Sequence, residues 1–329
     1  MKHWLLLFLP IFAVAQSTQP PIADPFAHTF SIVARDSLTG DLGVAVQSHW
    51  FSVGSLVAWA EAGVGAVATQ SFINVSFGPR GLALMKAGLS AQEAMDKLIR
   101  DDDGRDFRQV ALIDIHGHVA TYTGAKCVAE AGHIQGNGFS VQANMMLSNK
   151  VPSAMAAAFK RTAGMPLAER MMEALKAAQG VGGDIRGQQA AAILVVKGKA
   201  SDAPWKDKLV DLRVEDHPNA VTEMARILGV QRAYEHMNNG DLATEHGDME
   251  AAIREYGAAM TAYPENVEMK YWTAVSLVNA GKMADALPMF RDVFRKEPNW
   301  VEMTRRIVPS GLLVVSVTQL AEILMQAQK

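Results

Sequence analysis

The order of strand-like and helix-like segments between Thr29 and Val214 is the feature that most limits the fold of this chain. Three strands come first, then two helices, more strands, two further helices and a last pair of strands. A fold built from βαβ units would instead alternate one strand with one helix. The order therefore predicts an α+β fold in which helices cover two central antiparallel sheets.

Short-range patterns give the individual segments. Thr29–Arg35 and Leu42–Ser48 are rich in β-forming residues, and the turn residues between them predict a hairpin. Ser90, with Glu93 three positions later, predicts a capping box at the start of a helix that runs to about Arg100. The other predicted strands are 64–71, 107–115, 119–123, 138–146, 190–196 and 209–214, and the other predicted helices are 78–87, 152–162 and 167–179.

A second pattern begins near Pro218, where the strand signals stop. Four positions repeat with a spacing of 34 residues, which pairs Gly247 with Gly281, Ala252 with Ala286, Tyr256 with Phe290 and Pro264 with Pro298. This is the length of the tetratricopeptide repeat, a stack of paired helices. Residues 218–329 are therefore predicted to form an all-α domain of two repeats, 232–265 and 266–299, with capping helices at 219–238 and 312–325.

The first residues have the pattern of a secretory signal. Lys2 and His3 precede an apolar run, and Ala13-Val14-Ala15 has the small residues that signal peptidase recognises. We expect a signal peptide at 1–15 and an extended, proline-containing leader at 16–27, followed by the first folded domain at 28–217. The sequence thus predicts a periplasmic or secreted protein.

Charge and hydropathy exclude two classes of partner. The formal net charge is −3, and lysine and arginine do not cluster along the chain. Because binding to a phosphate backbone requires a basic face, nucleic acid is excluded. The apolar run near the N-terminus is about half of the ~20 residues that a membrane-spanning helix needs, so no membrane span is expected.

Residues 28–215 resemble the bacterial and archaeal family called domain of unknown function 1028. The stretches that carry the resemblance are 29–36, 40–46, 59–70, 78–82 and 144–146, in the same order as in the family. The resemblance implies membership of the N-terminal-nucleophile hydrolase superfamily, whose fold is a four-layer α-β-β-α sandwich. Some members of the family carry additional C-terminal modules, so the resemblance is compatible with helical repeats after residue 217.

The resemblance places Thr29 where the nucleophile of the superfamily stands. A threonine with a free α-amine carries its own general base, because the amine takes the hydroxyl proton as the oxygen attacks a carbonyl. Cleavage after Ala15 leaves thirteen residues in front of Thr29. Either a second cut follows at His28–Thr29, with attack of the Thr29 hydroxyl on the His28 carbonyl as one route, or Thr29 has no free amine.

Other polar residues are candidates for the same site. Ser48 and His49 come at the end of the second strand. A group that polarises the nucleophile would lie there; the alternative is that both side chains simply face solvent. Asn144 is a candidate oxyanion donor, although asparagine after a strand also satisfies backbone groups. Candidates for substrate binding follow the third strand: Gln70, Asn74 and Arg80. Arg80 could pair with a substrate carboxylate or with the sheet edge.

Two hypotheses of function follow. The first is a secreted amidohydrolase in which Thr29 attacks a small amide or peptide, with no metal or organic cofactor. The alternative is a non-catalytic binding module, in which an inactive hydrolase-like sandwich and the helical repeats dock onto a protein or envelope partner. The N-terminal residue of the mature protein distinguishes them.

Overall fold

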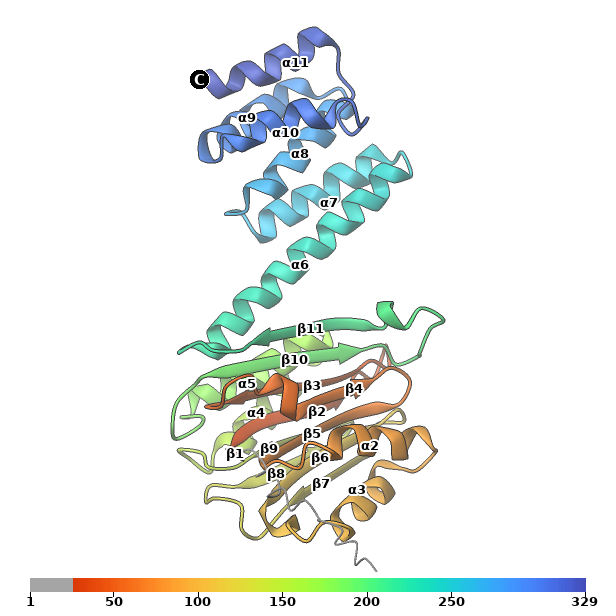
Figure 1. The fold of residues 1–329 in the computed structure, drawn as a ribbon, viewed down its shortest axis with the longest axis vertical. Helices are drawn as coiled ribbons and strands as arrows, with labels where there is room; N and C mark the ends of the chain where they lie inside the picture. Colours follow the sequence, from red (N-terminus) through yellow and green to blue (C-terminus); the bar gives the residue numbers. More distant parts are fainter. Residues whose placement is uncertain (1–25) are drawn as a thin grey trace, which may run out of the picture.

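The computed structural model describes residues 26–329. An α+β part is followed by a helical part, and the long helix α6 joins them (Figure 1). The predicted α+β fold with two antiparallel sheets and a C-terminal helical region is confirmed. The predicted signal peptide and the leader up to residue 25 lie outside the described residues.

Sheet A contains five antiparallel strands, with the order β1-β5-β6-β7 and with β4 paired to β5. Its strands are β1 (Phe26–Ala27), β4 (Ala58–Glu61), β5 (Gly65–Phe72), β6 (Arg108–Asp114) and β7 (Val119–Thr123). The last two residues of the predicted leader therefore belong to the sheet. They do not continue an unstructured segment, because they pair with the end of β5.

Sheet B contains six antiparallel strands in the order β11-β10-β3-β2-β9-β8. Its strands are β2 (Thr29–Arg35), β3 (Leu42–Ser48), β8 (Gly132–Gly136), β9 (Phe139–Ala143), β10 (Ala190–Val196) and β11 (Lys208–Val214). The predicted hairpin of β2 and β3 forms, and it aligns Thr29 with Ser48. The strand β2 lies in the middle of the sheet, between β3 and β9.

Both faces of each sheet are covered. Val33, Val44 and Val46 of sheet B pack with alanines of β5 and β6 between the two sheets. On the opposite face of β2, Phe30 and Ile32 pack against α4 (Val151–Arg161) and α5 (Leu167–Gly180). The outer face of sheet A packs against α2 (Phe77–Lys86) and α3 (Ala91–Arg100). Burial on both sides explains why apolar residues make up much of the central strands.

Some local predictions hold and some elements were not predicted. The capping box of Ser90 and Glu93 forms at the start of α3 with both of its hydrogen bonds. The strands β1, β4 and β8 and the one-turn helix α1 (Gly54–Val57) were not predicted. They are short, and β8 is bounded by Gly132 and Gly136, so their pairing partners rather than their own patterns define them.

The C-terminal part consists of helices. These are α6 (Ala220–Glu245), α7 (Met249–Ala262), α8 (Val267–Asn279), α9 (Met283–Lys296), α10 (Asn299–Ile307) and α11 (Val317–Leu324). Residues 34 positions apart have matching environments: Ala252 and Ala286 have no exposed surface, and Tyr256 and Phe290 are both buried. Within residues 26–329, no helix combines the length and apolarity needed to cross a membrane.

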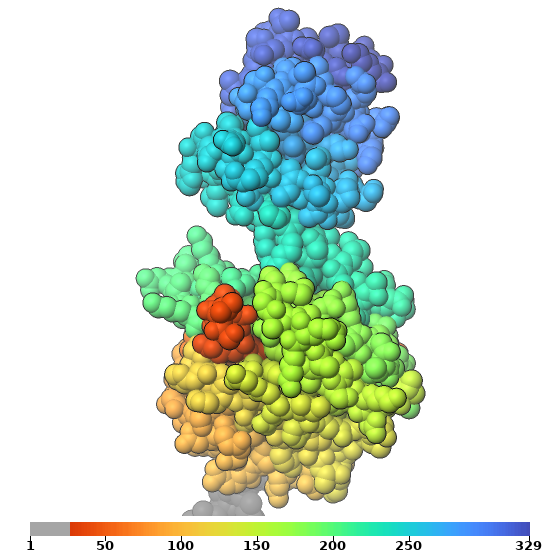
Figure 2. All heavy atoms as spheres, turned by 180° about the vertical axis from the view of Figure 1, so that it is seen from behind, coloured from red at the N-terminus to blue at the C-terminus, as the bar shows by residue number. Residues whose placement is uncertain are grey.

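The first turns of α6 belong to the α+β part. Val221, Met224 and Leu228 lie in the same core as α5 and β10. The first core therefore extends about ten residues beyond the boundary expected at Pro218. The rest of α6 leaves this core and packs against α7, which gives the molecule the narrow neck seen in Figure 2.

Candidate active site around Thr29

Thr29 lies at the start of β2 and is completely buried. Its carbonyl oxygen accepts hydrogen bonds from the backbone N–H of Asn144, at 3.1 Å, and from the side-chain amide of Gln70, at 3.2 Å. Its hydroxyl donates to the carbonyl oxygen of Ala27 at 2.7 Å. The sequence-predicted residues Thr29, Gln70, Asn144 and Ser48 are thus brought together where β2 begins and β3 and β9 end.

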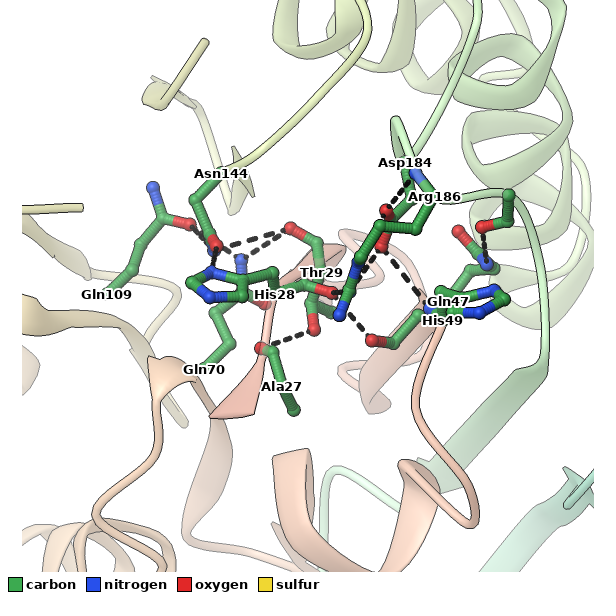
Figure 3. Close-up of polar contacts among 12 residues, drawn as sticks. Ala27, His28, Thr29, Gln47, His49, Gln70, Gln109, Asn144, Asp184 and Arg186 are labelled. Carbon is green, nitrogen blue, oxygen red and sulfur yellow. Dashed lines mark hydrogen bonds and ion pairs between the residues drawn. The ribbon is translucent and has the colours of Figure 1, made fainter. Parts of the chain in front are cut away.

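The carbonyl group of His28 receives two hydrogen bonds. The hydroxyl of Ser48 donates to its oxygen at 2.6 Å, and Nη2 of Arg186 donates to the same oxygen at 2.8 Å. Figure 3 shows the Arg186 guanidinium between Asp184 and the His28–Thr29 bond. Two donors at these distances would stabilise negative charge on this oxygen.

Asp184 fixes the position of Arg186. Nε of Arg186 donates to one carboxylate oxygen at 3.0 Å and Nη2 donates to the other at 2.7 Å, in a bidentate pair. The Asp184 side chain has no exposed surface. The loop before β10 supplies both residues, and Gly182 and Gly183, with φ values of 116° and 60°, allow its tight path.

Three buried amides form a network behind the His28–Thr29 bond. The amide nitrogen of Gln109 donates to the carbonyl of Ala143 at 2.9 Å, which fixes the orientation of that side chain. The oxygen of Gln109 then accepts from Gln70 at 2.7 Å and from Asn144 Nδ2 at 2.9 Å. Asn144 Oδ1 is therefore the atom that faces His28 Nδ1, at 2.8 Å, and it can only accept.

His28 is neutral in this environment. Its side chain is 1% exposed, and burial lowers the pKa of the imidazole below its ordinary value of 6.5. The hydrogen bond to Asn144 opposes this effect in part, and the charge of Arg186 adds to it. The neutral ring therefore carries its proton on Nδ1, where it donates to Asn144 Oδ1.

Acidification should destabilise the chain while residues 26–28 stay attached. Because the pKa of His28 is lower in the folded chain, the unfolded chain takes up a proton below pH 6.5 that the folded chain does not bind. The free energy of unfolding therefore falls between about pH 7.5 and about pH 5.5. We expect a larger fall for Thr29→Ala, which lacks the predicted nucleophile, than for the double variant with His28→Gln. Thermal melts of the two variants at both pH values measure the loss of stability. Equal losses in the two variants would contradict a buried neutral His28.

Three predicted site residues are placed differently. His49 contributes its backbone N–H, which donates to Asp184 at 3.3 Å, rather than its ring. Asn74 accepts from the backbone and hydroxyl of Ser76 at the start of α2. Arg80 is exposed and lies 4.0 Å from Asp101. In the described part of the chain, none of these side chains hydrogen-bonds to Thr29 or to the residue before it.

The site residues include no group with the composition of a metal centre. Among residues 26–329, no three His, Cys, Asp or Glu side chains come together in a way that could hold a metal ion. The groups around the His28–Thr29 bond are hydroxyls, amides and one guanidinium–carboxylate pair. The expectation of a reaction without a cofactor stays a prediction.

Sequence comparison gives the family. The family of unknown function DUF1028 matches residues 29–224, which is more than half of the chain. The chain belongs to the DUF1028 family. The resemblance found in the sequence is thereby confirmed, and the DUF1028 match begins at Thr29, directly after the residues of β1 and His28.

Structural comparison agrees with the family assignment. The crystal structure of a DUF1028 protein from Silicibacter pomeroyi is 29% identical, with a TM-score of 0.55 over 61% of this chain and 84% of that one. Anbu (ancestral beta-subunit) from Yersinia bercovieri aligns with a TM-score of 0.31 and 14% identity, over 61% of this chain and 93% of that one. A comparison with curated proteins found no match.

Proposed function

We propose that this DUF1028 chain is the precursor of an amidohydrolase that cuts its own His28–Thr29 bond and then uses Thr29 as an N-terminal nucleophile. The observation that carries the proposal is the pair of hydrogen bonds to the His28 carbonyl oxygen, from Ser48 at 2.6 Å and from Arg186 at 2.8 Å. A peptide oxygen that solvent cannot reach needs hydrogen-bond partners, and these two donors satisfy it in the resting chain. Their contribution grows when that carbonyl oxygen gains negative charge during the attack.

The cut would proceed through an ester. The Thr29 oxygen attacks the carbonyl carbon of His28, and the oxyanion that forms is stabilised by Ser48 and Arg186. The C–N bond then breaks, and the hydroxyl proton goes to the leaving nitrogen of Thr29. Water hydrolyses the ester between His28 and the Thr29 oxygen. The products are a His28 carboxylate and a Thr29 that carries both a free α-amine and a free hydroxyl.

The processed chain would repeat this chemistry on a substrate. The α-amine of Thr29 takes the hydroxyl proton, the oxygen attacks the carbonyl of a small amide or peptide, and water releases the acyl group. Helices on the outer faces of both sheets agree with the layer order of N-terminal-nucleophile hydrolases. That likeness supports the fold family, whereas the reaction rests on the residues around Thr29.

The alternative hypothesis is a binding module. It draws on the complete burial of Thr29 while residues 26–28 remain in place, because an uncut chain offers no reachable nucleophile. The matching environments 34 residues apart support tetratricopeptide-like repeats in α6 to α9, which would then dock a protein or envelope partner. In either case the sequence pattern of residues 1–15 supports export to the periplasm or the medium.

Activity on amides tests the enzyme hypothesis. A panel of fluorogenic acyl-amides and short peptides should be hydrolysed by protein that starts at Thr29, whereas protein that still retains residues 26–28 should gain activity only in step with its cut, followed by intact mass. Both forms should show similar melting curves, so that a loss of folding does not imitate a loss of activity. Equal turnover by the two forms would contradict a nucleophile that depends on its free amine.

A further inference from the structure

Residues 26–28 occupy the place where the proposed enzyme must bind the acyl part of its substrate. The carbonyl carbon that Thr29 attacks during the cut belongs to His28. The oxygen of this carbonyl already accepts hydrogen bonds from Ser48 and Arg186. The residues before that carbon are therefore positioned as the acyl side of a peptide substrate. The contacts of residues 26–28 with the rest of the chain therefore indicate how the acyl side of a substrate would be bound after the cut.

The backbone of this segment is held as a strand. Phe26 and Ala27 pair antiparallel with Phe72 and Ser71 at the end of β5. On this edge, β4 pairs with β5 only as far as Ala68, so departure of β1 would leave the end of β5 open to another extended chain. Ser71 has a φ of 75°, a conformation that non-glycine residues rarely adopt and that is common at ligand sites.

The side chain of His28 is almost completely buried. Its ring donates from Nδ1 to Asn144 Oδ1 at 2.8 Å, and its centroid lies 5.9 Å from the edge-on ring of Phe72. The Asn144 oxygen cannot turn away, because the amide nitrogen of the same side chain donates to Gln109. An occupant without a donor at this point would leave a buried acceptor unpaired.

We infer that the substrate of the processed enzyme is an extended peptide with histidine immediately before the scissile bond. The inference rests on the proposed function and adds its substrate class. The peptide adds a strand to the end of β5, its histidine donates from Nδ1 to Asn144, and its carbonyl oxygen accepts from Ser48 and Arg186. The bond that breaks is the amide after histidine, and the acyl group passes through an ester on Thr29 before water releases it.

Three matched substrates test the inference on the self-processed full-length chain. They are acetyl-Phe-Ala-X joined by an amide to a fluorogenic aminocoumarin, where X is histidine, leucine or Nδ1-methylhistidine. We expect kcat/KM for histidine to exceed that for leucine by at least about tenfold, since leucine leaves the Asn144 oxygen unpaired. Methylation of Nδ1 removes the donor and keeps the ring, so this substrate should be no better than leucine.

The outcomes separate the inference from the function beneath it. Hydrolysis of the leucine or methylated peptide as fast as the histidine peptide would overturn the substrate class and leave an active N-terminal threonine hydrolase. A chain that keeps residues before Thr29, or one that is processed and cleaves no amide, would overturn the proposed function and the inference with it. A shortened acetyl-histidine substrate should be slower than the tripeptide, and equal rates would contradict pairing with β5.

Discussion

Thr29→Ala should leave the His28–Thr29 bond uncut and should reduce turnover of any amide that the wild type cleaves by at least about 10³-fold. The substitution removes the attacking oxygen and otherwise only one methyl group. The cost in stability should be small, about 1 kcal/mol for the lost hydrogen bond to Ala27. Intact mass of the purified proteins measures the cut, the amide panel measures turnover, and melting curves measure the stability.

Two further substitutions at the same position serve as controls. Thr29→Val keeps the branched shape without the hydroxyl and should also remain uncut. Thr29→Ser keeps the hydroxyl and should be cut, although more slowly because its freer side chain is less well oriented. Cutting of Thr29→Val at the wild-type rate would show that another protease removes the leader.

Ser48→Ala should slow the cut by about 10² to 10³-fold, which is the usual effect of removing one oxyanion donor. The hydroxyl of Ser48 donates to the His28 carbonyl oxygen, and Arg186 would remain as the second donor. Ser48 is a cleaner choice than Arg186, because removal of Arg186 would leave the buried carboxylate of Asp184 without its charge partner. The rate is measured by the decay of the uncut mass.

A neighbouring serine provides the control for this variant. Ser71 is equally buried and lies at the end of β5, opposite Ala27. Ser71→Ala removes a buried hydroxyl of the same size and leaves both donors to the His28 carbonyl in place, so its rate should stay within a few-fold of the wild type. Similar slowing in both serine variants would mean that loss of packing, rather than loss of the donor, controls the cut.

Local sequence patterns predicted much of the fold. The hairpin of β2 and β3 has β-rich strands and a short polar turn, and α3 has its capping box, so each is defined within about twenty residues of sequence. The strand β1 has only two residues and exists because β5 lies beside it. No local pattern distinguishes it from an extended leader.

The candidate site could be predicted only in part. Thr29, Ser48 and Asn144 mark the ends of strands that the sequence shows, and the register of sheet B brings them together. Asp184 and Arg186 come from a glycine-rich loop, and the hydrogen bond from Arg186 to the His28 carbonyl joins residues 158 positions apart in the sequence. Such a contact depends on the packing of the whole domain.

One signal in the sequence was missed. Glutamines interrupt otherwise apolar strands at four places, Gln47, Gln70, Gln109 and Gln142, and all four are fully buried. A buried amide must find partners, so repeated glutamines in core strands indicate a polar network inside the sandwich. Two of them, Gln70 and Gln109, orient Asn144 and the Thr29 carbonyl.

The N-terminal residue of the mature protein tests the central claim most directly. The full-length chain should be expressed with its leader, purified from the exported fraction, and analysed by intact mass and N-terminal sequencing, with Thr29→Ala beside it. We predict a wild-type protein that begins at Thr29 and a variant that retains His28. A wild-type population that begins uniformly at Gln16, or at its cyclised form, would contradict the claim that this chain makes an N-terminal threonine.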